Sequence, residues 1–352
     1  MTREVFIQGR GLVSALGPDL RSATACLAAG GVAPGRLCGP DGSPAWPYFG
    51  IPDEDDDWLA RAHRLITRAQ AESGTADIDA PLFIASCSIH IGAIESNPAL
   101  HGDCLDFSDT IARWLGWHGP VYWISTACTS ASNALLAAAE RIRSGNASQA
   151  LVLGVELRNR FTCGGFAAMQ LLDTQRPRPL AADRSGLVLG EAIGAIRLGT
   201  EPTRWRLAGG ANVVDGRDPA GASTEAVTRM TQQALATAGL DAGDIDLVKL
   251  QAAGSPASDL AELEGLRAAL GKLPALTSLK AELGHTLGAS GAAELALLTA
   301  SIEEACWAPP RAPADPALGA RLCDEAPQAR FILHNILGFG GGHATVIVED
   351  CA

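Results

Sequence analysis

One cysteine of this chain, Cys128, lies at a position that suits a covalent nucleophile. Cys128 lies between the apolar segment Val121–Ile124 and the segment Ala131–Ile142, where small and apolar residues recur at helical spacing. The pattern predicts a short strand that runs into a helix closed by Ser144 and Gly145. A thiol at a helix N-terminus feels the positive end of the helix dipole, which favours the reactive thiolate. Cys128 is therefore a candidate covalent nucleophile.

The alternative for any cysteine is structural, because free cysteine is usually buried as a small hydrophobe. The chain has nine cysteines, an odd number, and no two of them form a Cys-x-x-Cys pair. This usage favours a reducing cytoplasm. No cluster has the spacing of zinc ligands, so we expect no bound metal.

Composition narrows the possible partners. The 352 residues are 47% hydrophobic and 19% charged, which is typical of a packed globular protein. The net charge of −12 argues against nucleic acid, whose phosphates need a basic surface. The longest apolar run, Leu287–Trp307, is interrupted by Glu294, Glu303 and Glu304, so we expect no membrane span. Met1–Ile7 is typical of a strand rather than of a signal peptide.

Strands and helices are predicted to alternate along the chain, which favours α/β layers with covered sheets. We expect loops at 9–17 and 34–52, an acidic helix start at 53–57, and a division into halves at 1–199 and 200–352. A faint similarity between Gly9–Ser14 and Gly209–Val214 hints at duplication. The predicted strands are 5–8, 82–86, 121–124, 151–155, 205–209, 247–251, 331–334 and 344–348, and the predicted helices are 18–29, 58–70, 223–238, 258–269 and 290–305.

Five segments in order resemble the β-ketoacyl-acyl-carrier-protein synthase family of condensing enzymes, within the thiolase superfamily. They are the opening Gly9–Gly17, the nucleophile turn Ser125–Cys128, the glutamate segment Arg178–Glu191, the lysine and histidine motif Ser278–Ala289, and the glycine loop Asn335–Gly342. The resemblance implies a five-layered αβαβα sandwich of two duplicated halves, assembled as a dimer.

The resemblance also implies roles for individual residues. Cys128 would accept an acyl group from the phosphopantetheine of an acyl carrier protein, with no tightly bound cofactor. The N–H groups of Cys128 and Phe339 would form an oxyanion hole. His285 would bind the thioester carbonyl, and Lys280 paired with Glu191 would hold His285 in place. Phe166, Met169 and Phe339 would shape the acyl pocket.

The chain departs from the family pattern at Gln251, which occupies the place of a second catalytic histidine. Glutamine keeps an N–H donor but cannot take up a proton. Other departures are a shortened segment between Ile91 and Trp117, short loops around 40–75, and His343 in place of an asparagine.

Three functions remain open at this stage. The chain could be a synthase that elongates acyl chains, a non-elongating acyltransferase, or a partner subunit resembling a chain-length factor, in a homodimer or a heterodimer. For the acidic carrier protein, Arg61, Arg64 and Arg68 share one predicted helical face, which is either a docking site or simply a solvated surface.

Overall fold

The structure is a computed structural model that describes residues 3–39, 45–53, 57–100, 102–217 and 221–352. Its main sheet has ten strands in the order β11-β10-β12-β13-β9-β1-β8-β6-β4-β5. Their bounds are β1 (Phe6–Ser14), β4 (Leu82–Ala85), β5 (Val121–Ile124), β6 (Gln149–Glu156), β8 (Ala192–Gly199), β9 (Trp205–Val214), β10 (Leu247–Lys249), β11 (Ala275–Thr277), β12 (Phe331–Leu337) and β13 (Gly342–Asp350).

The two halves of this sheet have the same topology. β4 pairs in parallel with β5 and β6, and β8 runs antiparallel to both β6 and β1. In the other half β10 pairs in parallel with β11 and β12, and β13 runs antiparallel to β12 and β9. The halves meet where β1 pairs with β9, at Phe6 and Arg206. The segments with the faint sequence similarity are thus equivalent strands at the centre.

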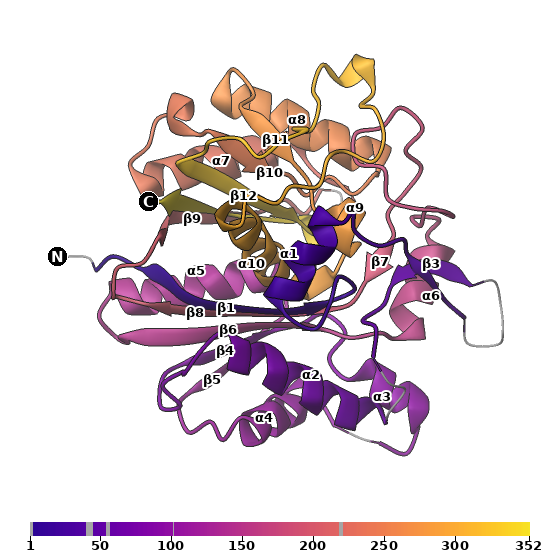
Figure 1. The fold of residues 1–352 in the computed structure, drawn as a ribbon, viewed down its shortest axis with the longest axis vertical. Helices are drawn as coiled ribbons and strands as arrows, with labels where there is room; N and C mark the ends of the chain where they lie inside the picture. The colour runs from indigo at the N-terminus through magenta and orange to yellow at the C-terminus, as the bar shows by residue number, and fades with distance from the viewer. Residues whose placement is uncertain (1–2, 40–44, 54–56, 101, 218–220) are drawn as a thin grey trace.

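Helices and the two half-sheets form five layers, as Figure 1 shows from bottom to top. The lower helices α2 (Trp58–Glu72) and α4 (Cys104–Trp114) cover one half-sheet, and α7 (Thr224–Ala238) and α8 (Pro256–Leu270) cover the other. Between the half-sheets lie α5 (Ser130–Arg143) and α10 (Ser290–Glu303). The remaining helices are α1 (Leu20–Ala28), α3 (Ile91–Ser96), α6 (Arg160–Ala168) and α9 (Lys280–Leu283). The expected αβαβα sandwich is confirmed.

The central helices are built from small residues because both of their faces are covered. In α10 every residue from Ser290 to Ser301 is buried, as expected for a helix that is apolar on all sides. Gly291 permits the crossing with α5, since a Cβ there would lie 2.6 Å from the backbone nitrogen of Ser132. This contact brings the start of α10 beside the start of α5, where Cys128 lies.

Two loop predictions were wrong. β1 continues through Gly9 and Gly11 to Ser14, because these glycines let the strand approach α2: a Cβ at Gly9 would lie 1.8 Å from Ser73 O. The predicted loop 34–52 contains β2 (Gly35–Leu37) and β3 (Trp46–Phe49), which form a small sheet with β7 (Leu189–Gly190). Of the acidic run 53–57, residues 54–56 lie outside the described residues, while Asp57 caps α2.

Candidate active site

Cys128 stands on a tight turn between β5 and α5. The preceding residue, Ala127, has φ +54°, a left-handed conformation that side chains other than glycine seldom adopt. The Ser130 side chain holds the turn, because its Oγ accepts from Thr126 N at 2.9 Å and donates to Ala127 O at 2.6 Å. The strand and helix predicted around Cys128 are therefore confirmed, and the side chain itself is buried at 3% exposure.

The glycine loop lies directly against this turn. A Cβ at Gly338 would lie 3.2 Å from Cys128 N, and Gly340 and Gly341 have φ values of +79° and +73°. The backbone N–H of Phe339 reaches the Cys128 sulfur. The N–H groups of Phe339 and Cys128 therefore both lie beside the thiol, where the predicted oxyanion hole would have its two donors.

His343 fixes the far side of this loop. Its Nε2 accepts from Ser223 N at 3.2 Å, so its Nδ1 carries the proton and donates to Gly341 O at 2.8 Å. Asp215 N donates to the same Gly341 carbonyl at 2.9 Å. The histidine therefore stabilises the loop that carries Phe339.

His285 is the side chain that lies within hydrogen-bonding distance of the Cys128 thiol. Its Nε2 lies 3.0 Å from Cys128 Sγ. The His285 backbone is hydrogen-bonded to the residues on either side of Leu189. His285 N donates to Val188 O at 2.7 Å, and Gly190 N donates to His285 O at 3.1 Å. Two motifs separated by more than 150 residues thus form one Cys-His pair.

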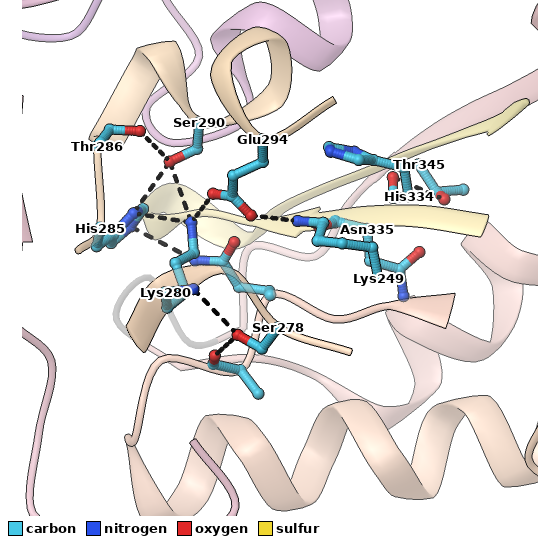
Figure 2. A network of polar contacts seen from close by, with 12 residues as sticks. Lys249, Ser278, Lys280, His285, Thr286, Ser290, Glu294, His334, Asn335 and Thr345 are labelled. Atoms are coloured by element: carbon cyan, nitrogen blue, oxygen red, sulfur yellow. Dashed lines mark hydrogen bonds and ion pairs between the residues drawn. The ribbon is translucent and has the colours of Figure 1, made fainter. Parts of the chain in front are cut away.

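Lys280 contacts His285, as expected, but its acidic partner is Glu294 rather than Glu191. Lys280 Nζ lies 3.3 Å from His285 Nδ1, 3.1 Å from Ser290 Oγ, and in an ion pair with Glu294 Oε1. Figure 2 shows Lys280 between His285 and Glu294. The pairing of Lys280 with Glu191 was therefore a wrong prediction.

Glu191 is instead buried in an ion pair with Arg61. Arg61 binds it through two parallel hydrogen bonds of 2.9 and 2.8 Å, and its carboxylate also accepts from Ile51 N and Arg158 N at 2.8 Å. Arg61 is only 1% exposed, whereas Arg64 and Arg68 have side chains 43% and 50% exposed. Arg61 is therefore part of neither a docking surface nor a solvated face.

Replacing Arg61 with leucine is expected to lower the free energy of unfolding by about 3–5 kcal/mol, because Glu191 would be left as an uncompensated buried charge. Arg64→Leu on the same helix is the matched control, and its exposed ion pair should be worth at most about 1 kcal/mol. Denaturant unfolding of both variants measures the difference. Equal losses would contradict the assigned role of the Arg61–Glu191 pair.

Gln251 reaches the site from the end of β10. Its Nε2 lies 3.5 Å from His285 Nε2, and its buried Oε1 has no hydrogen-bond partner among the described residues. The Glu262 carboxylate fixes the backbone here by accepting from Gln251 N at 2.8 Å and Ala252 N at 2.9 Å. The structure thus places Gln251 beside the Cys-His pair, where the resemblance put it.

A pocket of about 70 Å³ opens over the thiol, lined by Cys128, Gln251, Glu262, His285 and Phe339 among others. Phe166 packs on Phe339 with ring centroids 5.2 Å apart. Met169 is 53% exposed and does not line the pocket. Its role in shaping an acyl pocket stays a prediction that depends on a partner subunit.

Burial is the largest influence on the pKa values of Cys128 and His285. It raises the pKa of Cys128 to about 11, although Lys280 and the Phe339 N–H act in the opposite direction. Burial, with Lys280 and Lys249, also lowers the pKa of His285 well below its ordinary value. The helix dipole at this N-terminus favours the thiolate, but desolvation acts more strongly in the opposite direction. Near neutral pH the pair consists of a thiol and a neutral imidazole.

The rate of Cys128 alkylation by iodoacetamide is accordingly expected to rise about tenfold per pH unit from neutrality towards pH 11, because only the thiolate reacts. The raised pKa means that the thiolate fraction keeps growing above the pH at which an ordinary cysteine is already ionised. Peptide mapping after timed alkylation measures Cys128 separately from the exposed Cys38 and Cys351. A Cys128 rate that levels off near pH 8 would contradict this prediction.

Sequence reasoning missed two residues of the site, Glu294 and Lys249. Both are fully buried, and Lys249 Nζ donates to Glu294 Oε2 at 2.6 Å. A signal was present in each case: a charged residue inside an apolar segment is buried only when it is paired. Glu294 interrupts the apolar run 287–300, and Lys249 lies within an apolar strand.

A cysteine on a strand–helix turn with a buried histidine 3.0 Å away and a glycine loop against it, on a duplicated αβαβα scaffold, is the arrangement that the resemblance to condensing enzymes predicts. Comparison with known proteins agrees. Residues 97–203 match the N-terminal domain of β-ketoacyl synthases, and residues 208–312 match the C-terminal domain. The chain belongs to the β-ketoacyl synthase family.

Two curated relatives show how far the similarity extends. Nodulation protein E of a Rhizobium species is 31% identical, over 55% of this chain and 51% of the relative. The chloroplastic 3-oxoacyl-[acyl-carrier-protein] synthase II of Arabidopsis thaliana is 29% identical, over 69% of this chain and 51% of the relative. The aligned region thus covers about half the length of these relatives.

Solved structures agree on the fold. The ishigamide ketosynthase/chain length factor superposes with a TM-score of 0.86 at 21% identity, covering all of both chains. A ketosynthase in complex with its chain length factor from Xenorhabdus doucetiae gives 0.84 at 23% identity, over 99% of this chain and 98% of that one. In the described part of the chain, no helix is both long and apolar enough to cross a membrane.

Proposed function

We propose that this chain is a β-ketoacyl-acyl-carrier-protein synthase-like acyltransferase of fatty-acid or polyketide synthesis, acting in the cytoplasm. It would form an acyl-Cys128 thioester from an acyl group on the phosphopantetheine of an acyl carrier protein. The observation that carries this proposal is the 3.0 Å approach of His285 Nε2 to Cys128 Sγ, under the N–H groups of Phe339 and Cys128.

The first half-reaction follows from these groups. The Cys128 sulfur attacks the thioester carbonyl carbon, its thiol proton passes to the departing pantetheine sulfur, and negative charge develops transiently on the carbonyl oxygen. The N–H groups of Cys128 and Phe339 stabilise that charge. The carbon–sulfur bond to the carrier then breaks, and the pantetheine thiol leaves with a proton. None of these steps requires Gln251 to change its protonation state.

Decarboxylative condensation makes a different demand on Gln251. Loss of CO2 from a malonyl thioester produces an enolate, which needs donors aimed at its oxygen before it attacks acyl-Cys128. If the Gln251 amide turns by half a rotation, Oε1 accepts from a His285 Nε2–H and the NH2 group faces the pocket. This rotation also gives the unpartnered Oε1 a partner. Glutamine can thus donate but not exchange a proton, which favours acyl transfer over elongation.

The retained Cys-His pair argues against a purely structural partner subunit resembling a chain-length factor. We propose an assembly as a homodimer or as a heterodimer with a second ketosynthase-like subunit. The edge strand β5 supports this arrangement, because it ends the sheet and all four of its side chains are half-buried. Solved relatives of the same fold include a ketosynthase in complex with its chain length factor.

The test is the intact mass of the protein after incubation with a panel of acyl carrier proteins charged with different acyl groups. A mass gain equal to one acyl group supports the proposal, and later addition of malonyl carrier separates elongation from transfer. A folded protein that gains no mass with any acyl group, alone or with its partner subunit, would exclude both catalytic functions.

A further inference from the structure

Lys249 is a buried charge of this site that the proposed reaction does not use. It lies on β10, two residues before Gln251, and its side chain has no exposed surface. Its Nζ donates to Glu294 Oε2 at 2.6 Å and to the backbone carbonyl of Asn335, on β12, at 2.7 Å. Removing an ammonium from water is unfavourable unless it is paired. Its position therefore ties β10 and β12 to the central helix α10.

Glu294 is shared between two lysines, one on each carboxylate oxygen. Lys249 takes Oε2 and Lys280 takes Oε1. Lys280 then directs its other protons at Ser290 Oγ and His285 Nδ1, at 3.1 and 3.3 Å. Figure 2 shows this row of contacts from Lys249 through Glu294 and Lys280 to His285. Ser290 Oγ also lies 3.2 Å from Nδ1. An ammonium can only donate, so the contact with Lys280 favours an accepting Nδ1, with the ring proton on Nε2 and the Ser290 hydroxyl donating to Nδ1.

The charges around His285 reinforce this arrangement. Lys280 and Lys249 both lower its pKa, in addition to burial, and Cys128 faces the other ring nitrogen as a neutral thiol. The Glu294 carboxylate pairs with both lysines. Burial raises the pKa of Glu294, but the two lysines lower it by more. Among the described residues no carboxylate hydrogen-bonds the ring, whose contacts are Gln251, Lys280, Ser290 and Cys128.

Three further ionisable groups lie farther out. Glu262 interacts with Lys249, but burial raises its pKa and its oxygens are taken by three N–H donors, from Gln251, Ala252 and Asn335. Glu156 acts on the thiol and is satisfied by Ser86, Cys87 and Ser88. His334 is fully buried and its pKa is well below the ordinary value, so it adds no charge.

We propose that Lys249 is a positioning residue: by holding Glu294, and Lys280 through it, Lys249 keeps His285 in the neutral tautomer that carries its proton on Nε2. The ring then always presents a donor to Cys128 and to the pocket. The proposal concerns the ring itself and does not rest on which thioester the site accepts.

The experiment is imidazole nuclear magnetic resonance of ¹⁵N-histidine-labelled protein over a pH series, without any acyl substrate. Three variants are compared with the wild type. Lys249→Met removes the ammonium and keeps a side chain of similar length. Lys249→Arg keeps the charge. Thr299→Val is the matched control, because Thr299 is buried on the same helix α10 but bonds only to Leu295 and Ala296.

The wild type is expected to show His285 as the Nε2–H tautomer, neutral across the range in which an ordinary histidine titrates. Lys249→Met should raise the pKa of His285 by about one unit, since one nearby positive charge is lost, and should mix the two tautomers. Lys249→Arg should restore the wild-type spectrum, and Thr299→Val should not change it.

Two results would overturn the proposal. One is a folded Lys249→Met protein whose His285 keeps the wild-type tautomer and pKa. The other is a wild-type protein whose His285 carries its proton on Nδ1, a measurement that does not depend on any variant folding. Both are independent of acyl transfer, so a failure of the proposed function leaves this test intact.

Discussion

Replacing Cys128 with alanine is expected to abolish the acyl-enzyme mass gain with every acyl carrier protein that labels the wild type. Cys128 is the thiol that lies 3.0 Å from His285 Nε2, and it has the Phe339 N–H beside it. Alanine removes the only atom that can form the thioester there, while a buried side chain of similar size keeps the turn packed. Intact-protein mass spectrometry measures the loss directly.

Cys163→Ala is the matched control for that result. Cys163 is buried in the same apolar cluster as Cys128, and burial raises its pKa to about 11 as well. No histidine among the described residues hydrogen-bonds it, so its removal should leave acylation within a few-fold of the wild type. If the Cys128→Ala protein still gains one acyl group while the Cys163→Ala protein does not, the assignment of the nucleophile is wrong.

Replacing Gln251 with histidine is expected to raise the rate of malonyl-carrier decarboxylation by about 10²-fold or more, the lower end of what a positioned acid–base group contributes. Gln251 lines the pocket beside Cys128 and His285, and imidazole is close to glutamine in size. The new ring would supply a group that can both donate and exchange a proton. Release of labelled CO2 from malonyl carrier measures the effect.

Acylation of Cys128 in the same variant should change by no more than a few-fold, because that step relies on the thiol and the oxyanion hole. Gln251→Ala completes the series, since it removes the donor without adding an imidazole. A Gln251→His protein that acylates normally yet decarboxylates no faster would show that glutamine does not limit elongation. If the wild type elongates acyl chains as fast as the Gln251→His variant does, glutamine likewise does not limit elongation.

Local patterns were enough to predict most elements. The strand Val121–Ile124, the turn at Cys128 and the following helix appear in the structure as expected. Such elements depend on apolar spacing and on residues that end helices, which the sequence displays directly. The prediction failed at β1, where Gly9 and Gly11 indicated a loop. Their actual role is to let α2 pack closely, which only the packed structure reveals.

The partners of buried charges could not be predicted in the same way. Lys280 and Glu191 occur in neighbouring motifs, yet Glu191 binds Arg61, 130 residues away in the chain, and Lys280 binds Glu294. A sequence shows that a charge is present but not which opposite charge the fold brings to it. The burial of Arg61 could not be predicted either, because its helical spacing with Arg64 and Arg68 suggested an exposed face.

The sequence by itself therefore determined the scaffold and the family of this protein, because these depend on residue order along the chain, and it predicted Cys128 as the candidate nucleophile. The tertiary structure alone decided the chemical state of the site. Burial by several elements raises the pKa of Cys128 and lowers that of His285, which favours a thiol beside a neutral imidazole. Two lysines from different segments share one carboxylate to hold that state. Desolvation and charge pairing act through space, so they are fixed only when distant segments meet.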